Sequence, residues 1–274
     1  MMTRPWFLVL LLMAWGCPDG RGTGERLVVT GSSTVAPLMA EIGKRFESER
    51  PGVRVDVQTG GSSRGIADVR GGLADVGMAS RAPKAGEDDL HFFPIARDGV
   101  CLFVHRDNPV GELTDDQIAA IYTGQVRDWR EVAGGTADGA EAPITVVNKA
   151  EGRATLEVFL AHFGLASRDV RATVVVGDNE QAVKTVAADP NAIGYVSIGT
   201  AEHSASRGVP IRLLPAGGVE ASTDALADGR FPIARPLNLV TREEPAGLVR
   251  ELIDYARSPA VHDLVRELFF VPVR

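Results

Sequence analysis

Three hydroxyl residues follow a short apolar run near the amino-terminal end of the chain. Residues 27–30 are apolar or β-branched, Gly31 ends the run, and Ser33 and Thr34 lie among the hydroxyl residues that come next. Apolar residues then recur at helical spacing, so these hydroxyls and the Val35 N–H lie where a helix leaves backbone donors unpaired. The positive end of a helix dipole favours an anion. Two interpretations stay open at this point, capping of the helix and binding of an anion.

The same order of strand, polar loop and helix occurs twice more. Alternating valines over 53–57 lead to the loop 60–65, and an apolar run over 143–147 leads to the loop 148–155. A helix is expected after each loop, with apolar positions at Ile66, Val69 and Leu73 in the first and at Leu156, Phe159, Leu160 and Phe163 in the second. Glycines in both loops allow the backbone to approach a ligand closely. The recurrence favours an anion site over three unrelated helix caps.

Strands and helices alternate along the whole chain, which predicts an α/β fold with mostly parallel sheets flanked by helices. Further expected elements are strands over 74–79 and 92–106, a helix capped by Thr114 and Gln117, a return strand over 237–240, and closing helices over 246–256 and 259–269. Ligands bind at the carboxyl ends of strands in such sheets, where all three polar loops lie. The sequence therefore predicts a site between two lobes.

Composition limits the class of partner. The chain has 274 residues, 45% of them hydrophobic, which is enough for two packed lobes, and its formal net charge is −7. A nucleic-acid-binding protein is expected to carry a basic stripe, and this sequence shows none. An anion would therefore be bound by local donors and not by a general positive field.

The first residues resemble an export signal. Arg4 precedes an apolar run over 6–14 that is too short to span a membrane. We expect residues 1–16 to be a signal peptide, Cys17 to be a lipidation site, and 17–25 to be a linker. The alternative is ordinary cleavage nearby, with Cys17 incidental. Cys101 lies in an apolar run and is expected to be a buried, inert thiol.

Motifs for catalysis are missing from the sequence. The five histidines are dispersed, there is no nucleophile elbow, phosphate loop or dinucleotide fingerprint, and two cysteines cannot form a cysteine metal site. Ser62 and Ser63 have no base near them in the sequence and are expected to be hydroxyl ligands rather than nucleophiles. We therefore expect no enzyme activity, no cofactor and no metal.

Four cations lie in or beside the polar loops, namely Arg64, Arg81, Lys149 and Arg153. Together with neutral hydroxyl and N–H donors, they suit a tetrahedral oxyanion. Arg81 is the leading candidate for a direct charged ligand, although for each of the four a surface salt bridge is the alternative. The acidic residues 87–89 are expected to form a solvated turn.

Several ordered segments resemble the phosphate-binding proteins that serve bacterial phosphate ABC importers. These segments are Thr30–Pro37, Gly60–Ile66, Ala74–Arg81, Leu113–Gly124 followed by Trp129 to Val132, and Phe231–Leu237. The resemblance implies a two-lobed periplasmic binding protein with two hinge crossovers. The expected lobes are 26–98 with 237–274, and 99–236, with hinge strands near 99–106 and 236–240. The implied phosphate ligands are Ser33, Thr34, Val35, Ser62, Ser63, Arg64, Arg81, Lys149, Gly152, Arg153, Ala154 and Thr155.

Two departures from the family pattern affect these ligands. Lys149 stands where family members usually have an arginine, which removes a bidentate fork, and Arg153 and Ala154 replace a serine and a glycine. Ala154 must adopt a conformation that glycine prefers, or the loop differs. One branch of the family has an aspartate in place of Arg81, and that aspartate accepts the proton of hydrogen phosphate. Without it, discrimination against sulfate must depend on Glu151, Asp75 or a hydroxyl oxygen.

We expect a monomeric receptor that binds one inorganic phosphate, closes around it by a hinge, and delivers it to the membrane permease of an ABC importer. Its expected location is the periplasm or the outer face of the cell membrane, with a lipid anchor if Cys17 is acylated. The alternatives are a receptor for another oxyanion, a phosphate sensor without import, and a phosphate-ester hydrolase.

Overall fold

The computed structural model describes residues 24–132 and 141–273. The predicted signal peptide, Cys17 and most of the predicted linker therefore lie outside the described residues, as does part of the loop after Trp129. Within the described ranges, no helix has both the length and the apolar character that a membrane span requires.

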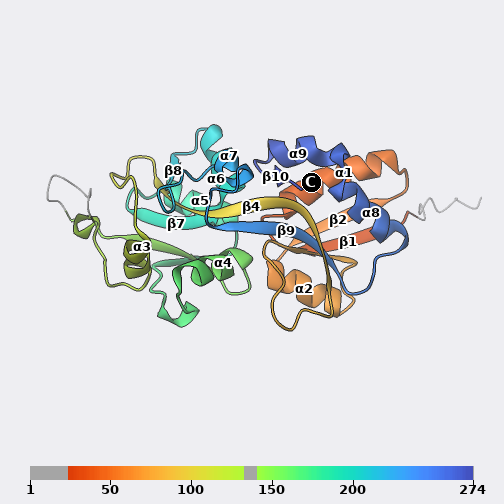
Figure 1. Ribbon diagram of the computed structural model, residues 1–274, viewed down its shortest axis with the longest axis horizontal. Helices are drawn as coiled ribbons and strands as arrows, with labels where there is room; N and C mark the ends of the chain where they lie inside the picture. The colour runs from red at the N-terminus through yellow and green to blue at the C-terminus, as the bar shows by residue number, and fades with distance from the viewer. Residues whose placement is uncertain (1–23, 133–140, 274) are drawn as a thin grey trace, which may run out of the picture.

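One long sheet runs through the molecule in the order β2-β1-β3-β9-β4-β7-β5-β6 (Figure 1). Its strands are β1 (Arg26–Gly31), β2 (Arg54–Thr59), β3 (Val76–Ala79), β4 (His91–His105), β5 (Thr145–Lys149), β6 (Val174–Val176), β7 (Ala192–Ser197) and β9 (Ala234–Thr241). The pairs β1–β2, β1–β3, β5–β6 and β5–β7 are parallel, whereas β9 and β4 pair antiparallel to their neighbours. Two short strands, β8 (Ile211–Leu213) and β10 (Val271–Pro272), also pair with β4.

Helices cover the sheet on both sides (Figure 1). They are α1 (Ala36–Glu49), α2 (Ser62–Arg70), α3 (Asp115–Tyr122), α4 (Ala154–Phe163), α5 (Asn179–Ala187), α6 (Ile198–Ser206), α7 (Thr223–Ala227), α8 (Gly247–Arg257) and α9 (His262–Glu267). Three short 3₁₀ turns complete the elements: η1 (Trp129–Glu131), η2 (Ser167–Asp169) and η3 (Pro259–Val261). The prediction of an α/β fold with sheets flanked by helices is confirmed.

In the first lobe, side chains of β1 alternate between the two faces of the sheet. Leu27 and Val29 pack in the core that α1, α8 and α9 cover, whereas Val28 packs with Ile66 and Val69 of α2 on the other face. This alternation follows from the two-residue repeat of a strand. Because α1 follows β1 and α2 follows the parallel strand β2, the two helices begin at the same edge of the sheet, beyond the carboxyl ends of these strands.

The second lobe has a core of its own, built from residues between Val100 and Ile233. The first lobe's core uses residues up to Ala96 and from Leu237 onward. The chain therefore passes between the two cores on β4 and β9, which pair with each other from His91 opposite Thr241 to Gly99 opposite Ala234. The two paired strands cross the middle of the molecule in Figure 1.

Most of the local predictions are confirmed, and three are wrong. Thr114 and Gln117 form the capping box of α3, Cys101 is buried, and burial raises the pKa of its thiol well above the usual value. By contrast, Leu73 lies beyond the end of α2 and is 73% exposed, because a glycine at C-cap and another after it end the helix. The helix predicted over 259–269 is a 3₁₀ turn followed by the short α9.

The third wrong prediction concerns Glu87 of the acidic turn, whose other members Asp88 and Asp89 are exposed as predicted. Glu87 is buried rather than solvated because its carboxylate accepts two hydrogen bonds from the Arg81 guanidinium, at 2.8 and 2.6 Å. Burial opposes the charge of Glu87, yet the hydrogen bonds from Arg81 and the Lys84 N–H outweigh it and lower the pKa of this carboxyl below its usual value.

Candidate anion-binding site

A buried ion pair lies where the two strands pass between the lobes. Asp98 of β4 and Arg235 of β9 are directly opposite each other in the antiparallel register, and both side chains are essentially inaccessible to solvent. The Asp98 Oδ2 accepts from Arg235 Nε at 3.0 Å and from Arg235 Nη2 at 2.7 Å. The other oxygen, Oδ1, accepts from the Gly199 N–H in the first turn of α6 at 3.4 Å. Asp98 thereby holds the guanidinium in one orientation.

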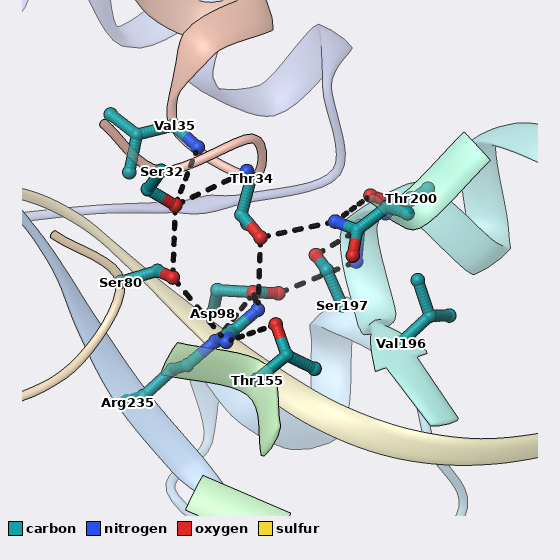
Figure 2. Close-up of polar contacts among 12 residues, drawn as sticks. Ser32, Thr34, Val35, Ser80, Asp98, Thr155, Val196, Ser197, Thr200 and Arg235 are labelled. Atoms are coloured by element: carbon teal, nitrogen blue, oxygen red, sulfur yellow. Dashed lines mark hydrogen bonds and ion pairs between the residues drawn. The ribbon is translucent and has the colours of Figure 1, made fainter. Parts of the chain in front are cut away.

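The remaining Arg235 donors reach hydroxyls from both lobes (Figure 2). Nη2 donates to Thr34 Oγ1 at 3.3 Å, and Nη1 donates to Thr155 Oγ1 at 3.0 Å and to Ser80 Oγ at 3.5 Å. Thr34 precedes α1, Ser80 follows β3, and Thr155 lies in the first turn of α4. We call Ser32, Thr34, Ser80 and Thr155 the hydroxyl cluster; Arg235 links its two sides.

Within the first lobe, Ser32 contacts Ser80 through its side chain, and Ser62 contacts the cluster through the Ser80 backbone. Ser32 Oγ donates to Ser80 Oγ at 2.9 Å and accepts from the N–H groups of Thr34 and Val35, at 3.2 and 3.4 Å. The Ser80 N–H donates to Ser62 Oγ at 3.2 Å. Ser32 thus stabilises the turn before α1, whose N-cap residue Val35 has no side-chain cap, and Thr34 Oγ1 contacts the second lobe. Anion binding by this loop stays a prediction.

Asn179 joins the cluster from the start of α5. Its Nδ2 donates to Thr34 Oγ1 at 3.0 Å and to Thr200 Oγ1 at 3.2 Å, and its Oδ1 accepts from Lys149 Nζ at 3.2 Å. A cavity of about 360 Å³ opens here, and Ser33, Asn179 and Thr200 are among the residues that line it. Asn179 therefore lines this cavity and also contacts Thr34 of the first lobe.

Lys149 is almost fully buried behind Asn179. Its Nζ donates to the Asp178 carbonyl at 2.6 Å as well as to Asn179. The pKa of Lys149 is lowered to about 7, chiefly by burial; the nearby charges of Arg235 and Arg153 also lower it, whereas Asp178 and Glu180 oppose the shift. Lys149 therefore contacts the cleft through Asn179 and can gain a proton if an anion arrives.

The hydrogen-bond pattern determines which way the hydroxyl protons point. Thr34 Oγ1 accepts from both Asn179 and Arg235, and Thr155 Oγ1 accepts from Arg235. Arginine has no acceptor, and an amide NH₂ group only donates, so each of these hydroxyl oxygens accepts a hydrogen bond and its own O–H is left to donate to another acceptor. The arrangement suits a ligand that only accepts hydrogen bonds, such as an oxyanion.

Three helices begin near the hydroxyl cluster: Thr34 lies just before α1, Ser62 begins α2, and Thr155 lies in the first turn of α4. The first N–H groups of a helix have no partner within it, and the helix dipole adds a partial positive charge there. Hydroxyls, the starts of three helices and one neutralised arginine are therefore close together. Among the described residues, no group of three or more metal-ligating side chains is found.

Several of the predicted ligands have other partners in the structure. Arg64 is exposed and pairs with Asp68 of its own helix, with 3.2 Å between Nε and Oδ2. The Ser63 N–H donates to the Gly152 carbonyl at 3.2 Å across the cleft. Arg81 contacts Glu87 and Glu157 and points away from the hydroxyl cluster. A ligand role for these residues stays a prediction.

The loop before α4 accommodates Arg153 and Ala154, which belong to the first departure from the family pattern. Gly152 has a φ of +78°, and Ala154 begins α4 as an ordinary helical residue, so the loop differs and Ala154 needs no special conformation. A Cβ on Gly61 would lie 3.0 Å from Arg153 Cδ, and one on Gly177 would lie 3.6 Å from Arg153 Nη2. The Arg153 side chain therefore extends over the cleft between the two lobes.

Two carboxylates suggested as acceptors for a phosphate proton lie elsewhere. Asp75 accepts from the Val28 N–H at the edge of the sheet, and Glu151 contacts Ser167 on the surface. Asp98 is the carboxylate that contacts the cluster's arginine. A hydroxyl oxygen, the third suggestion, stays a prediction.

Sequence reasoning missed Arg235, Asp98, Asn179, Ser32 and Ser80 as members of the site. A signal existed for the first two: Asp98, next to Arg97, lies within the apolar strand expected over 92–106, and Arg235 is the one charge of the segment Phe231–Leu237. Such charges are rare without a partner. Nothing in the sequence indicates that they partner each other, since 137 positions separate them.

Comparison with known proteins agrees with this geometry. A model of the PBP superfamily domain matches residues 19–260, which is most of the chain. The chain belongs to the PBP superfamily. Within that superfamily, the phosphate-binding protein PstS of Bacillus subtilis is 28% identical over 253 residues, covering 90% of this chain and 80% of that protein.

The chain also resembles solved structures of phosphate-binding proteins from ABC transporters. A phosphate ABC transporter substrate-binding protein from Clostridium perfringens, solved with bound phosphate, aligns with a TM-score of 0.82 and 29% identity, covering 91% of this chain and all of that one. An ABC-type phosphate transport receptor from Vibrio cholerae aligns with a TM-score of 0.73 and 27% identity, and the alignment covers 90% of this chain and 100% of that one. The predicted resemblance to phosphate-binding proteins of ABC importers is confirmed.

Proposed function

We propose that this chain is a solute-binding protein that captures inorganic phosphate between its lobes and delivers it to an ABC importer. The observation that carries the proposal is the Arg235 guanidinium, which is held by Asp98 and donates to hydroxyls of both lobes. The phosphate-bound relative from Clostridium perfringens supports phosphate as the ligand. The chemistry required is recognition alone, and we assign no catalytic step.

In the proposed complex, one phosphate is bound by Thr34, Thr155 and Ser62 and by the N–H groups at the starts of α1, α2 and α4. Arg235 and Asn179 supply hydrogen bonds to the threonine oxygens, so the hydroxyl protons are directed to the ligand. Lys149 and Arg153 supply the positive charge that a dianion needs, because Asp98 already neutralises Arg235. Ser33, Val35, Ser63 and Gly152 belong to the same proposed ligand shell, and Ser33 lines the cavity beside Asn179.

The remaining parts of the proposal concern the cell. We propose that the chain works outside the cytoplasm as a monomer and docks on the membrane permease of an importer. An anchor through an acylated Cys17 belongs to the same proposal, and that residue lies outside the described ranges. The names of the relatives, which are phosphate-binding proteins of ABC transporters, support this context.

Isothermal titration calorimetry with phosphate tests the ligand directly. Thr34→Val and Thr155→Val each remove one hydroxyl donor and keep the shape, so each should weaken phosphate binding by about 10- to 100-fold, the effect of losing one hydrogen bond to a charged group. Thr185→Val, whose hydroxyl bonds within α5, is the matched control and should bind as the wild type does. Absence of heat from the wild type at millimolar phosphate would overturn the proposal; parallel titrations with sulfate and arsenate identify another oxyanion.

A further inference from the structure

Glu157 is a carboxylate of the second lobe whose partners all come from the first lobe. It lies in the first turn of α4, two residues after Thr155. Its Oε2 is 2.8 Å from Arg81 Nε, its Oε1 is 2.8 Å from Lys84 Nζ, and its Oε1 accepts from Ser63 Oγ at 3.4 Å. We call Glu157, Arg81, Lys84 and Ser63 the interlobe ion cluster.

The first-lobe side of this cluster is rigid. The Arg81 guanidinium donates twice to Glu87 and once to the Ala82 carbonyl, and the Lys84 N–H also donates to Glu87. Burial disfavours the charge of Arg81, but Glu87 and Glu157 compensate for it and raise the pKa of Arg81 above its ordinary value. Arg81 and Lys84 carry two positive charges against the single negative charge of Glu87. This face is therefore complementary to one further carboxylate.

The contact between Arg81 and Glu157 depends on closure of the lobes. Arg81 Nε and Glu157 Oε2 are both buried and face each other without an aligned hydrogen bond, so their attraction is mainly electrostatic. Water is largely excluded there, which strengthens the attraction relative to an exposed pair. If the lobes separate, Glu157 loses all three partners at once, whereas Arg81 keeps Glu87.

We propose that Glu157 is a positioning residue that holds the two lobes closed and thereby sets how long the bound anion stays. Glu157 contacts no residue of the hydroxyl cluster, so it acts through the position of α4, which carries Thr155. The inference rests on the proposed function, because the retained ligand is the proposed phosphate. An interaction made only in the closed form raises the population of that form, and apparent affinity follows that population.

Glu157→Gln is the appropriate change, since it removes the charge and keeps the size of the side chain. Replacing Arg81 instead would leave the buried Glu87 without its partner and would destabilise the lobe itself. We expect Glu157→Gln to raise the rate of ³²P-phosphate dissociation, chased with unlabelled phosphate, by about tenfold, between the effects of exposed and buried ion pairs. The association rate should change less than twofold, because the open form binds first. Glu112→Gln removes the same charge from an exposed position of the second lobe and is the matched control.

Two further readouts separate this role from a merely structural one. Salt should accelerate dissociation from the wild type and have a much smaller effect on Glu157→Gln, because the screened attraction is absent from the variant. Lys84→Met introduced into the wild type should raise the rate of phosphate dissociation, whereas the same change introduced into Glu157→Gln should leave that variant's rate unchanged. A destabilised α4 would instead slow association and leave the salt dependence unchanged, which would overturn the proposal, as would a dissociation rate equal to that of Glu112→Gln.

A readout without ligand keeps this inference separate from the proposed function. Small-angle scattering in phosphate-free buffer should give a larger radius of gyration for Glu157→Gln than for the wild type. If the wild type fails to bind phosphate but this expansion is seen, the proposed function fails and the closing role of Glu157 stands. Equal radii in the two proteins, together with unchanged dissociation, would contradict the closing role.

Discussion

At the scale of single residues, the guanidinium of Arg235 makes hydrogen bonds in three directions. It donates to Asp98 on one side, to Thr34 and Ser80 in the first lobe, and to Thr155 in the second. A lysine could not replace it, because an ammonium group has no fixed fork with which to contact all four partners. Asp98 also keeps the net charge of the buried pair at zero, so the pair itself adds no excess charge to the site.

Arg235→Met should lower the free energy of unfolding by about 3–5 kcal/mol, because it leaves the Asp98 carboxylate buried without a counter-ion. Urea denaturation followed by circular dichroism measures the change. Arg230→Met, which removes an exposed arginine that pairs only with Asp228, should change the free energy by less than about 0.5 kcal/mol. Equal stability of the two variants would contradict the role assigned to the buried pair.

Lys149 makes anion binding dependent on pH. Its pKa is lowered to about 7, chiefly by burial, so it is partly neutral in the free protein, and a bound anion favours its charged form. Because the pKa of the complex then lies above that of the free protein, binding takes up a proton and affinity falls as pH rises above 7. Calorimetry at pH 8 in two buffers of different ionisation enthalpy should show uptake of roughly 0.5–0.9 proton more for the wild type than for Lys149→Met.

The matched control for this measurement is Lys184→Met on the exposed side of α5. It should take up the same number of protons as the wild type, since Lys184 contacts no part of the cluster. If Lys149→Met takes up as many protons as the wild type, the proton belongs to the ligand or to another group, and the account of Lys149 fails.

Sequence reasoning could select Thr34, Ser62 and Thr155, but not Ser80 or the ion pair that contacts these hydroxyls. Thr34, Ser62 and Thr155 each follow a strand and begin a helix, and that local pattern is sufficient to select them. Arg81 carries a similar local signal, yet its guanidinium binds Glu87, six residues away on a loop whose burial no periodicity predicts. Whether Arg81 binds a ligand or pairs with a buried carboxylate depends on tertiary contacts that the sequence does not show.

At the scale of elements, α2 lies unusually close to the sheet. A Cβ added to Gly65 would lie 2.6 Å from the Thr30 carbonyl oxygen, 2.9 Å from Gly31 Cα and 3.1 Å from the Met78 carbonyl oxygen. Only a glycine at this position allows the helix to bring Ser62 next to Ser80 at the end of β3. The position of Ser62 therefore depends on Gly65, because this residue has no side chain to separate α2 from β1 and β3.

Gly65→Ala should lower the free energy of unfolding by about 1–3 kcal/mol and weaken phosphate binding, because backbone atoms that cannot move aside force α2 away from β1 and β3. Chemical denaturation and calorimetry on the same sample measure the two effects. Gly111→Ala makes the same change where a Cβ meets no atom within 4 Å and should leave both quantities unchanged. An unchanged affinity in Gly65→Ala would show that the position of α2 does not control the site.

Elements with strong periodicity were predictable, and elements defined by their neighbours were not. The apolar stripe of α1 and the alternating valines of β2 appear in the sequence as they do in the structure. In contrast, β8 and β10 are two or three residues long and exist because they pair with β4. The helix α6 begins directly where β7 ends, so its apolar residues merge with those of the strand in the sequence.

At the scale of the whole molecule, an acidic protein holds an anion site at the junction of two cores. The net charge of −7 repels anions at long range, so attraction must come from donors concentrated in the cleft. Polar contacts between the lobes include Asn179 to Thr34, Ser63 to Gly152, Thr223 to Phe269, Arg97 to Ala227, and Glu157 to Ser63, Arg81 and Lys84. A ligand that contacts both lobes adds to these contacts.

Phosphate at about 100 times its dissociation constant should stabilise the folded protein by about 2.7 kcal/mol, which corresponds to a rise of roughly 5–10 °C in the midpoint of thermal unfolding. Scanning calorimetry measures this rise. The double variant Thr34→Val/Thr155→Val should show less than a quarter of it at the same phosphate concentration. A rise of equal size in the double variant would place the phosphate outside the hydroxyl cluster.

The most direct test of the central claim is a crystal structure of the protein grown with millimolar phosphate. The account predicts one tetrahedral anion in the cleft, within hydrogen-bond distance of Thr34 Oγ1 and Thr155 Oγ1 and in contact with the amino-terminal ends of α1, α2 and α4. A cleft without the anion, or phosphate bound only at a surface away from these two hydroxyls, would contradict it.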